Sequence, residues 1–569
     1  MAGKTPLLTA SVTTWTLPKA MDAPKKVTIT IDGRVIETTE GLTIIQVTDS
    51  IGIPVPRYCY HPGLSIVGNC RICLVKVEKI PKLVPACATP VQDGMVVYTH
   101  TDDVIEARRS VLEFLLLNHP VDCPVCDRSG ECYLQDYYME FGLYRRRRFA
   151  PRLHKAKAKP IGPYVILDQE RCILCTRCIR VCEEVAKKPQ LGLFQRGNRT
   201  VLDVFPGQQL DHDYSGCTVD VCPVGALLDR DFRFKARVWF LRRTRSVCPG
   251  CSTGCNIYID WNEDKPYLAQ GQRVFRLKPR YNPDVNRYWM CDYGRYGYKY
   301  IDRDRIPQPY RQADGRLRPI EWSEALEFLR THIEATLREV GPSGIAVLLS
   351  PHLSTEELYL GRKLFVEALG VRDIHYEMPT RDPKADDFLI RPDKFPNAAG
   401  ARLLGLGTEG SSRAILENAA QGRYRLLWLV GQNPVRCYGA ELFQAVVRQT
   451  PLVVLQTVNW TESTALAHLI LPATPFAEKE GTFINAQHRI QRFWQAVHPY
   501  KQARPDWVIF QDVARALGLP GWHYVRAEDV FQEMARRLPV FEGLDYGTIG
   551  DRGVVLQPEK ATVPSGVGA

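Results

Sequence analysis

Apolar and polar side chains alternate in two short runs over residues 27–38, on either side of Asp32-Gly33. This alternation around a two-residue Asp-Gly turn predicts a β-hairpin with one buried face. The apolar residues of 42–47 predict a short helix, and residues 95–98 predict a further strand. The first hundred residues are therefore expected to form a small unit of strands and one helix.

The second half of the chain has a different pattern. Short apolar runs at 345–349, 425–430 and 452–456 predict buried strands. A capping box at 354–357 predicts the start of a helix that runs to Leu369. Strands that alternate with helices predict a parallel sheet, in which the loops at the carboxyl ends of the strands bind nucleotide-like cofactors in many proteins.

Length and composition are those of a multidomain globular protein. With 569 residues the chain is too long for one hydrophobic core and is expected to form several units. Its content of 45% hydrophobic and 24% charged residues argues against extensive disorder. No apolar run approaches the roughly 18 residues that span a bilayer. Residues 1–26 are interpreted as a polar arm without the pattern of a secretory signal.

The net charge of +11 is unevenly distributed along the chain. Between Leu143 and Pro163 there are many arginine and lysine residues and no acidic one. A basic strip can bind nucleic acid, anionic lipid or an acidic partner, or it can be a solvated linker. No zinc-finger histidine pair or aromatic RNA-binding motif lies nearby. We therefore expect a linker, or a surface buried against a partner subunit.

The cysteines carry the candidate chemistry. Fifteen of the 18 cysteines, with one histidine, form four sets within the first 291 residues. The sets are Cys59, Cys70, Cys73 and Cys87; His119, Cys123, Cys126 and Cys132; Cys172, Cys175, Cys178 and Cys222; and Cys248, Cys251, Cys255 and Cys291. Closely spaced soft thiolates are the ligands that iron–sulfur clusters require. Four such sites in series predict an electron-transfer chain, and the length of the chain argues against a disulfide framework.

Spacing suggests a cluster type for each set. The first set, C-x10-C-x2-C-x13-C, suits a [2Fe–2S] cluster. The third set has three cysteines at two-residue intervals and a remote Cys222-Pro223, the ferredoxin pattern for a [4Fe–4S] cluster. The fourth set is interpreted as a further [4Fe–4S] site. Zinc is the alternative for the first and fourth sets, because it accepts the same four ligands.

His119 completes the second set. It follows a helix predicted over residues 104–117, and the motif that begins with it contains only three cysteines. A histidine beside a proline is more often a capping or core residue. Here it stands where a fourth ligand is otherwise missing, and imidazole is a competent iron ligand. We therefore predict a [4Fe–4S] cluster held by one histidine and three cysteines.

Cys182, Cys217 and Cys437 lie outside the four sets. Cys182 follows Cys178 at the interval at which two-cluster ferredoxins place a ligand of their other cluster. A fifth cluster would need four ligands, and only three cysteines remain. We expect Cys182 and Cys217 to be buried thiols.

In this order of motifs the chain resembles the large iron–sulfur subunit of respiratory complex I, the bacterial NADH–quinone oxidoreductase. The resemblance covers nearly the whole chain from residue 27, and the histidine-plus-three-cysteine motif is its most specific part. The fourth set resembles the N-terminal cluster site of molybdopterin oxidoreductases. The matching stretches are LNHPVDCPVC at 117–126, CILCTRC at 172–178, DVCPVGALLD at 220–229 and LILPATPFAEKEGTFIN at 469–485.

The resemblance implies a multidomain fold. A β-grasp [2Fe–2S] ferredoxin-like domain is followed by small α/β cluster-binding domains, and then by an α/β molybdopterin-oxidoreductase-like region without the C-terminal β-barrel of the catalytic enzymes. The predicted domains are a polar arm at 1–26, the [2Fe–2S] domain at 27–103, the histidine-containing [4Fe–4S] domain at 104–160, the four-cysteine ferredoxin-like [4Fe–4S] domain at 161–240, the molybdopterin-oxidoreductase-type [4Fe–4S] domain at 241–300 and the α/β region at 301–569.

The resemblance also implies a function. Electrons from NADH would enter a flavin on a neighbouring subunit, pass through one [2Fe–2S] and three [4Fe–4S] clusters held here, and leave toward quinone. The implied partners are the FMN- and NADH-binding subunit, a small [2Fe–2S] subunit and quinone-side hydrophilic subunits. The implied location is peripheral, at the cytoplasmic face of the bacterial inner membrane, with membrane contact only through partners. Neither molybdenum nor nucleic acid is expected, and no residue is assigned a catalytic role.

Two other oxidoreductases share a row of clusters of this kind. A molybdenum or tungsten formate dehydrogenase would need a Cys or selenocysteine on the metal followed by His, whereas the spare Cys437 is followed by Tyr438. A diaphorase-type accessory subunit of a hydrogenase is the other alternative. A scaffold stapled by zinc is disfavoured, because the 16 ligands stand in ferredoxin-type order.

His119 gives the first testable prediction. His119→Cys is expected to keep a cluster but to shift its reduction potential, because a thiolate adds a negative charge. His119→Ala is expected to lose or degrade the cluster. Low-temperature EPR of the reduced protein measures both effects. Unchanged spectra in both variants would remove His119 from the ligand set.

Overall fold

The computed structural model describes residues 25–145, 147, 151–380, 382–407 and 411–560. The chain divides into two compact units. The first unit comprises residues 1–121, 133–154 and 173–177, and the second unit comprises residues 122–132, 155–172 and 178–569. The six predicted domains are a finer division and stay predictions. Among the residues described, no helix is both long and apolar enough to cross a membrane.

The first unit contains a five-stranded sheet with the order β2-β1-β5-β3-β4. The strands are β1 (Lys26–Ile31), β2 (Arg34–Thr39), β3 (Leu74–Val77), β4 (Val84–Pro85) and β5 (Val96–Tyr98). The predicted hairpin is confirmed, because Ile31 pairs with Arg34 across the two-residue turn. Asp32 and Gly33 have φ angles of 48° and 80°, as a type I′ turn requires. β1 and β5 run parallel.

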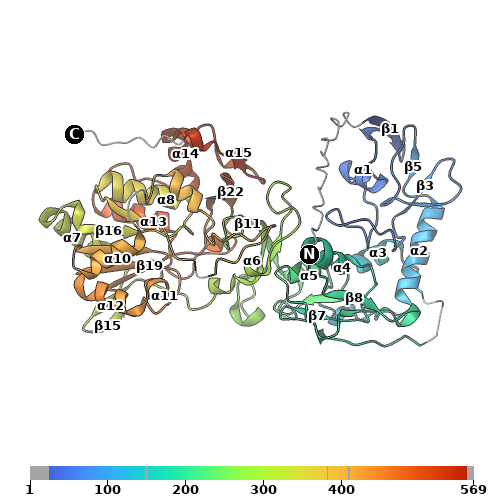
Figure 1. Cartoon of the computed structure of the whole chain (residues 1–569), viewed down its shortest axis with the longest axis horizontal. Helices are drawn as coiled ribbons and strands as arrows, with labels where there is room; N and C mark the ends of the chain where they lie inside the picture. The colour runs from blue at the N-terminus through green and yellow to red at the C-terminus, as the bar shows by residue number, and fades with distance from the viewer. Residues whose placement is uncertain (1–24, 146, 148–150, 381, 408–410, 561–569) are drawn as a thin grey trace, which may run out of the picture. The chain divides into compact units, whose positions relative to one another are not determined.

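The core of the first unit lies between this sheet and helix α1 (Ile44–Ser50), drawn in blue in Figure 1. Val27, Ile29 and Ile31 of β1 point into this core, as the alternating pattern predicts. Cys73 and Cys87 belong to the same buried cluster. Helices α2 (Asp102–Leu116) and α3 (Tyr133–Phe141) complete the unit and pack against each other. The predicted helix after residue 104 is thus confirmed.

The second unit has small sheets and short helices up to about residue 300. The helices there include α5 (Ser215–Val221) and α6 (Asp292–Tyr296). One sheet has the order β10 (Leu227–Asp229), β7 (Val165–Leu167) and β6 (Lys159–Pro160), and β8 (Leu191–Phe194) forms a hairpin with β9 (Val201–Val204). A further sheet consists of β11 (Arg242–Val247), β12 (Asn256–Trp261) and β13 (Val274–Pro279). Short elements of this kind leave many loops, and the cysteines of the fourth set, with Cys172, Cys178 and Cys222 of the third, lie in or beside these loops.

A seven-stranded sheet with the order β15-β14-β20-β19-β18-β16-β17 dominates the rest of the second unit. A smaller sheet consists of β21 (Gly481–Ile484), β22 (Arg489–Phe493) and β23 (Val554–Val555). The strands of the seven-stranded sheet are β14 (Tyr310–Ala313), β15 (Arg316–Pro319), β16 (Ile345–Leu348), β17 (Asp373–His375), β18 (Leu426–Val430), β19 (Leu452–Thr457) and β20 (Leu469–Pro472). The strands from β16 to β20 are parallel, whereas β14 is antiparallel to its neighbours. The predicted parallel sheet is therefore confirmed.

Helices cover both faces of this sheet. Ile345 and Val347 of β16 join a core with α7 (Trp322–Glu339), α8 (Thr355–Arg362), α13 (Asp506–Ala516) and α14 (Ala527–Arg537). Ala346 and Leu348 join a separate core with α10 (Ser412–Ala420) and α12 (Ala440–Gln449). The period of two along β16 thus sends alternate side chains to opposite helical layers, which surround the strands in Figure 1.

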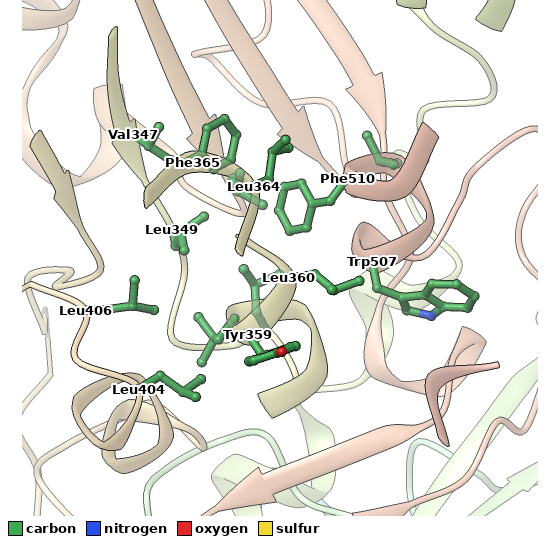
Figure 2. Packing of buried hydrophobic residues seen from close by; sticks show 14 of the residues in the cluster. Val347, Leu349, Tyr359, Leu360, Leu364, Phe365, Leu404, Leu406, Trp507 and Phe510 are labelled. Atoms are coloured by element: carbon green, nitrogen blue, oxygen red, sulfur yellow. The ribbon is translucent and has the colours of Figure 1, made fainter. Parts of the chain in front are cut away.

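The larger of these cores is built around aromatic side chains. The rings of Phe365 and Phe510 lie 5.9 Å apart, and Figure 2 shows them in the same core as Val347. The helix predicted from the capping box begins as expected, because Ser354 and Glu357 make both reciprocal hydrogen bonds. Its second half, residues 363–368, is a π-helix, which the sequence pattern does not indicate.

Glu356 of α8 gives a prediction about stability. This side chain is fully buried, and its carboxylate accepts hydrogen bonds from the backbone and hydroxyl of Thr482 and from the hydroxyl of Tyr546. Burial raises the pKa of Glu356 to about 7. Because the folded pKa lies above the unfolded one, this group's stabilising contribution is lost as the pH rises through about 7.

We expect Glu356→Gln to become more stable relative to the wild type between about pH 4.5 and about pH 7, by up to roughly 3 kcal/mol. The difference in Tm between the two proteins over this range measures the effect. Glu324→Gln is the matched control, since the Glu324 side chain is 54% exposed. Parallel Tm curves for Glu356→Gln and the wild type would contradict the prediction.

Candidate metal centres

The first cysteine set lies within the first unit and is brought together by three segments. Cys59 and Cys70 lie in the loop between α1 and β3, Cys73 directly precedes β3, and Cys87 follows β4. Cys59, Cys73 and Cys87 are at most 1% exposed. The backbone N–H of Cys59 lies 3.4 Å from the Sγ of Cys70 and donates to it. The predicted set is therefore a compact group of thiols.

The thiols of this set also interact with one another. Hydrogen bonds from the Cys70 and Cys87 thiols lower the pKa of Cys59, and a hydrogen bond from Cys87 lowers the pKa of Cys73. The pKa values of Cys70 and Cys87 are raised, chiefly because their S–H groups donate these bonds. Four thiolates together would need nearby positive charge. The donor set fits an iron–sulfur cluster, whose iron ions supply that charge.

The fourth set lies within the second unit and is closed by α6. All four of its cysteines are buried. The backbone N–H of Cys248 donates to the carbonyl of Cys255 at 2.8 Å, so the β11–β12 hairpin brings these two together. Cys291 caps α6 and accepts from the backbone N–H of Gly294 at 3.5 Å. Segments about forty residues apart therefore converge on this site.

Glycine is required where α6 meets the fourth set. A Cβ on Gly294 would lie 2.7 Å from the Sγ of Cys248 and 3.8 Å from that of Cys291. Burial raises the pKa of Cys248 to about 12, and it also raises the pKa of Cys255 and of Cys291. Neighbouring thiolates raise these pKa values further. As in the first set, the group is suited to binding cations.

The second and third sets each draw residues from both units. Cys123, Cys126 and Cys132 belong to the second unit, and the half-buried His119 belongs to the first. In the third set Cys175 belongs to the first unit, and its three partners belong to the second. Both of these ligand sets stay predictions. Among the residues described, no three or more His, Cys, Asp or Glu side chains are grouped as ligands of a single metal ion.

The backbone around Cys175 is unusual. Leu174 and Thr176, on either side of it, have φ angles of 54° and 60°. Left-handed conformations at two such residues are costly, and strain of this kind is concentrated at functional sites. This loop conformation is consistent with the three closely spaced cysteines acting as ligands.

Within the second unit, the second set lies against the third. Cys222 ends α5, and Gly225 follows it by three residues. A Cβ on Gly225 would lie 2.4 Å from the Sγ of Cys126. The thiol of Cys126 therefore contacts the loop that carries Cys222, and only glycine allows this approach.

The fourth set is joined to the same helix. Asp292, which follows Cys291, accepts hydrogen bonds from the backbone N–H and hydroxyl of Ser215 at 2.8 and 2.6 Å, and from the N–H of Gly216 at 2.9 Å. These groups lie at the first turn of α5, so Asp292 caps the helix that ends at Cys222. Arg295 of α6 forms a buried ion pair with Asp220 of α5.

Sequence analysis missed these connecting residues. Asp292 and Arg295 come directly after a predicted ligand, in the run Cys-Asp-Tyr-Gly-Arg at 291–295. Their position suggests a supporting role, but their contacts with residues 215–220 lie some seventy positions away. No local pattern predicts those contacts.

Cys182 and Cys217 are buried thiols, as expected. Both are fully buried; the Sγ of Cys182 lies 3.4 Å from the Nε2 of His212, and that of Cys217 lies 3.2 Å from the carbonyl oxygen of Met290. Burial raises the pKa of each to about 12, so both are protonated at neutral pH. Their neutral state is that of structural thiols.

A cavity of about 500 Å³ opens at the carboxyl ends of the parallel strands, where Ser350, Gly431 and Thr457 line it. Gly250 and Gly294, beside the fourth cysteine set, line it too. Its described lining contains no cysteine, and Cys437 lines a different cavity.

The lysine that lines this cavity is neutralised by two carboxylates. The Nζ of Lys479 lies 2.8 Å from Glu357 and 2.9 Å from Asp506. Both carboxylates and the lysine are buried, so the positive charge is compensated within the chain. Lys479 therefore attracts a phosphate group less than its position in the sheet suggests, and Arg436 is a second basic side chain in the lining.

Several basic residues of the strip between Leu143 and Pro163 form ion pairs with acidic residues of the same unit. Arg147 forms an ion pair with Glu113, Lys157 lies 2.9 Å from Glu170, and Lys159 lies 2.7 Å from Asp203. Arg146 and Arg148 lie outside the described residues. These pairs reduce the positive charge that the strip presents.

Five family models match the chain in the predicted order. They are the 2Fe-2S iron-sulfur cluster binding domain at 24–102, the NADH-ubiquinone oxidoreductase-G iron-sulfur binding region at 108–147, the ferredoxin-like domain of NADH-quinone oxidoreductase subunit 3 at 162–228, the molybdopterin oxidoreductase Fe4S4 domain at 241–303, and the molybdopterin oxidoreductase model at 305–396 and 395–516. The multidomain α/β architecture with [2Fe–2S] and [4Fe–4S] domains is thus confirmed.

Known proteins also resemble the chain. It is 39% identical over 65% of its length to the NADH-ubiquinone oxidoreductase 75 kDa subunit of Reclinomonas americana, covering 52% of that protein. It is 38% identical over 63% of its length to an NADH-quinone oxidoreductase subunit of Rickettsia bellii, covering 50% of it. A solved NAD+-reducing [NiFe]-hydrogenase chain aligns at 28% identity and a TM-score of 0.34, over 37% of this chain and 91% of that one.

The chain spans about half the length of the curated relatives it matches. The matches to them and to the NADH-ubiquinone oxidoreductase-G iron–sulfur model nevertheless confirm the predicted resemblance. They identify the chain as a relative of the large, 75 kDa iron–sulfur subunit of the NADH–quinone oxidoreductases.

Proposed function

We propose that this chain is an electron-transfer subunit of an NADH–quinone oxidoreductase. It carries electrons through one [2Fe–2S] and three [4Fe–4S] clusters, from a flavin subunit toward quinone. The clusters supply one-electron redox chemistry when bound, and the chain holds them, excludes water from their thiolates and fixes their spacing. No residue of the chain is assigned a catalytic role in this proposal.

The proposed ligands are the four predicted sets. The [2Fe–2S] cluster is held by Cys59, Cys70, Cys73 and Cys87. The [4Fe–4S] clusters are held by His119, Cys123, Cys126 and Cys132; by Cys172, Cys175, Cys178 and Cys222; and by Cys248, Cys251, Cys255 and Cys291. The burial of the first and fourth sets and the glycine that admits the thiols of the fourth support this assignment.

One observation carries the electron-transfer proposal. In the second unit, Cys126 contacts the loop after Cys222, and Asp292 beside Cys291 caps the helix that ends at Cys222. Cysteines of three sets therefore share one continuous piece of structure. A zinc scaffold has no need to connect its sites in this way, whereas an electron path does.

The proposed partners follow from the relatives. They are the FMN- and NADH-binding subunit, a small [2Fe–2S] subunit and the quinone-side hydrophilic subunits of the complex. The proposed location is the cytoplasmic face of the bacterial inner membrane, with membrane contact through those partners. The α/β region serves as a scaffold and docking surface, and this role is supported by the internal neutralisation of Lys479 in its cavity.

Metal analysis tests the proposed function. Anaerobically purified protein is expected to contain about 14 irons per chain and no molybdenum, with EPR signals from both cluster types after reduction. Molybdenum or tungsten near one per chain would instead indicate a catalytic subunit of the formate dehydrogenase class. Iron near ten with zinc near one would make one four-cysteine site structural.

Gly294 tests the fourth set separately. Gly294→Ala is expected to remove about four irons per chain, because the new Cβ would lie 2.7 Å from the Sγ of Cys248. Gly250→Ala is the matched control, since its Cβ would lie 3.5 Å from the same sulfur, an ordinary contact. Iron analysis and EPR compare the two. Equal iron contents in both variants would contradict a cluster at this position.

A further inference from the structure

Arg108 occupies a position where an apolar residue is expected. It lies on α2 one turn after Val104 and one turn before Leu112, both of which are buried. Spacing of four residues puts all three on one face of the helix. Arg108 is itself 0% exposed. The buried stripe of α2 therefore contains a cation.

Within the described part of the chain, no hydrogen bond compensates this charge. The Nε and both terminal nitrogens of Arg108 lack a hydrogen-bond partner among the described residues. The ring of Phe141 lies beside the guanidinium group, with its centroid 5.1 Å from the guanidinium carbon. An arginine stays protonated even when burial lowers its pKa, as it does here. A buried charge without a partner costs free energy of folding, so a negative charge nearby would stabilise it.

Several groups that can carry a negative charge raise the pKa of Arg108. Those that act on it electrostatically are Glu140, Cys73 and Asp32, with a smaller effect of Tyr137. Glu140 and Asp32 are exposed to solvent, and none of the described ion pairs joins either of them to Arg108. The carboxylate of Asp32 already accepts hydrogen bonds from the backbone and hydroxyl of Thr99 at 2.7 and 2.6 Å.

Cys73 is the buried member of this group, at 1% exposure. It precedes β3 directly, and α2 packs against β3. A cluster held by Cys59, Cys70, Cys73 and Cys87 would bring a net negative charge to this place, and reduction would add one more electron. A buried cation near one ligand favours the reduced form of the cluster, because little solvent lies between the two charges.

We propose that Arg108 sets the reduction potential of the [2Fe–2S] cluster, as a buried cation on the helix that packs against the strand directly after Cys73. The inference rests on the proposed function, since it requires the first set to hold that cluster. Its effect is to raise the potential, so that the cluster accepts electrons more readily. A purely structural role, such as packing on Phe141, would stabilise the fold without changing the potential.

Substitution of Arg108 separates charge from packing. Arg108→Met keeps much of the length of the side chain and removes its charge, and Arg108→Lys keeps the charge. We expect Arg108→Met to disfavour reduction of the [2Fe–2S] cluster by about tenfold or more, a shift of about −59 mV for one electron. Arg108→Lys is expected to retain most of the wild-type potential. Redox titration followed by EPR, on the full chain with its clusters, measures both.

Arg109→Met is the matched control. Arg109 is the next residue of α2, its side chain is 42% exposed and it pairs with Glu106 at 3.8 Å. The same chemical change there is expected to leave the [2Fe–2S] potential unchanged, because solvent screens the charge. The potentials of the [4Fe–4S] clusters serve as internal standards in every variant.

The possible outcomes are distinct. An unchanged [2Fe–2S] potential in Arg108→Met, or an equal shift in Arg108→Lys, would overturn the role of the charge. If Arg108→Met fails to retain its cluster, Arg108→Gln takes its place as the variant without the charge. Its [2Fe–2S] potential is then compared with that of Arg108→Lys in the same way. A wild-type chain without a [2Fe–2S] signal would instead contradict the proposed function, and so the two failures are distinguishable.

Discussion

Burial of thiols without compensating charge is the constraint on which this structure depends. In the first and fourth sets, most of the cysteines are almost inaccessible to solvent, and their pKa values are shifted by burial or by one another. Such groups cannot all ionise unless cations are present. Arg108 is a buried cation on the helix that packs against the strand after Cys73, and iron would supply further positive charge.

In the second unit, other buried charges are compensated by ion pairs within the unit. Lys479 lies between Glu357 and Asp506, and Arg305 forms a buried ion pair with Glu478. Buried pairs of this kind fix the relative position of the segments they join, although their net contribution to stability is small. These pairs lie at the edge of the parallel sheet, where Lys479 and Asp506 line the same cavity as Gly250 and Gly294 beside the fourth cysteine set.

Glycines and one carboxylate connect the cysteine sets of this unit. Gly225 and Gly294 let sulfur atoms approach the backbone, and Asp292 caps the helix that ends at Cys222. Spacing between redox centres controls the rate of electron transfer, so a rigid connection is as important as the ligands themselves. The supporting residues therefore carry part of the proposed function.

The sequence by itself determined the features that depend on neighbouring residues. The turn at Asp32-Gly33, the buried strand at 426–430, the capping box at 354–357 and the spacing of the cysteines are all local patterns. The tertiary structure alone decided that Arg108 is buried on the helix that packs against β3 and that Asp292 reaches α5. Burial and close approach arise between segments far apart in the chain, and no local pattern specifies them.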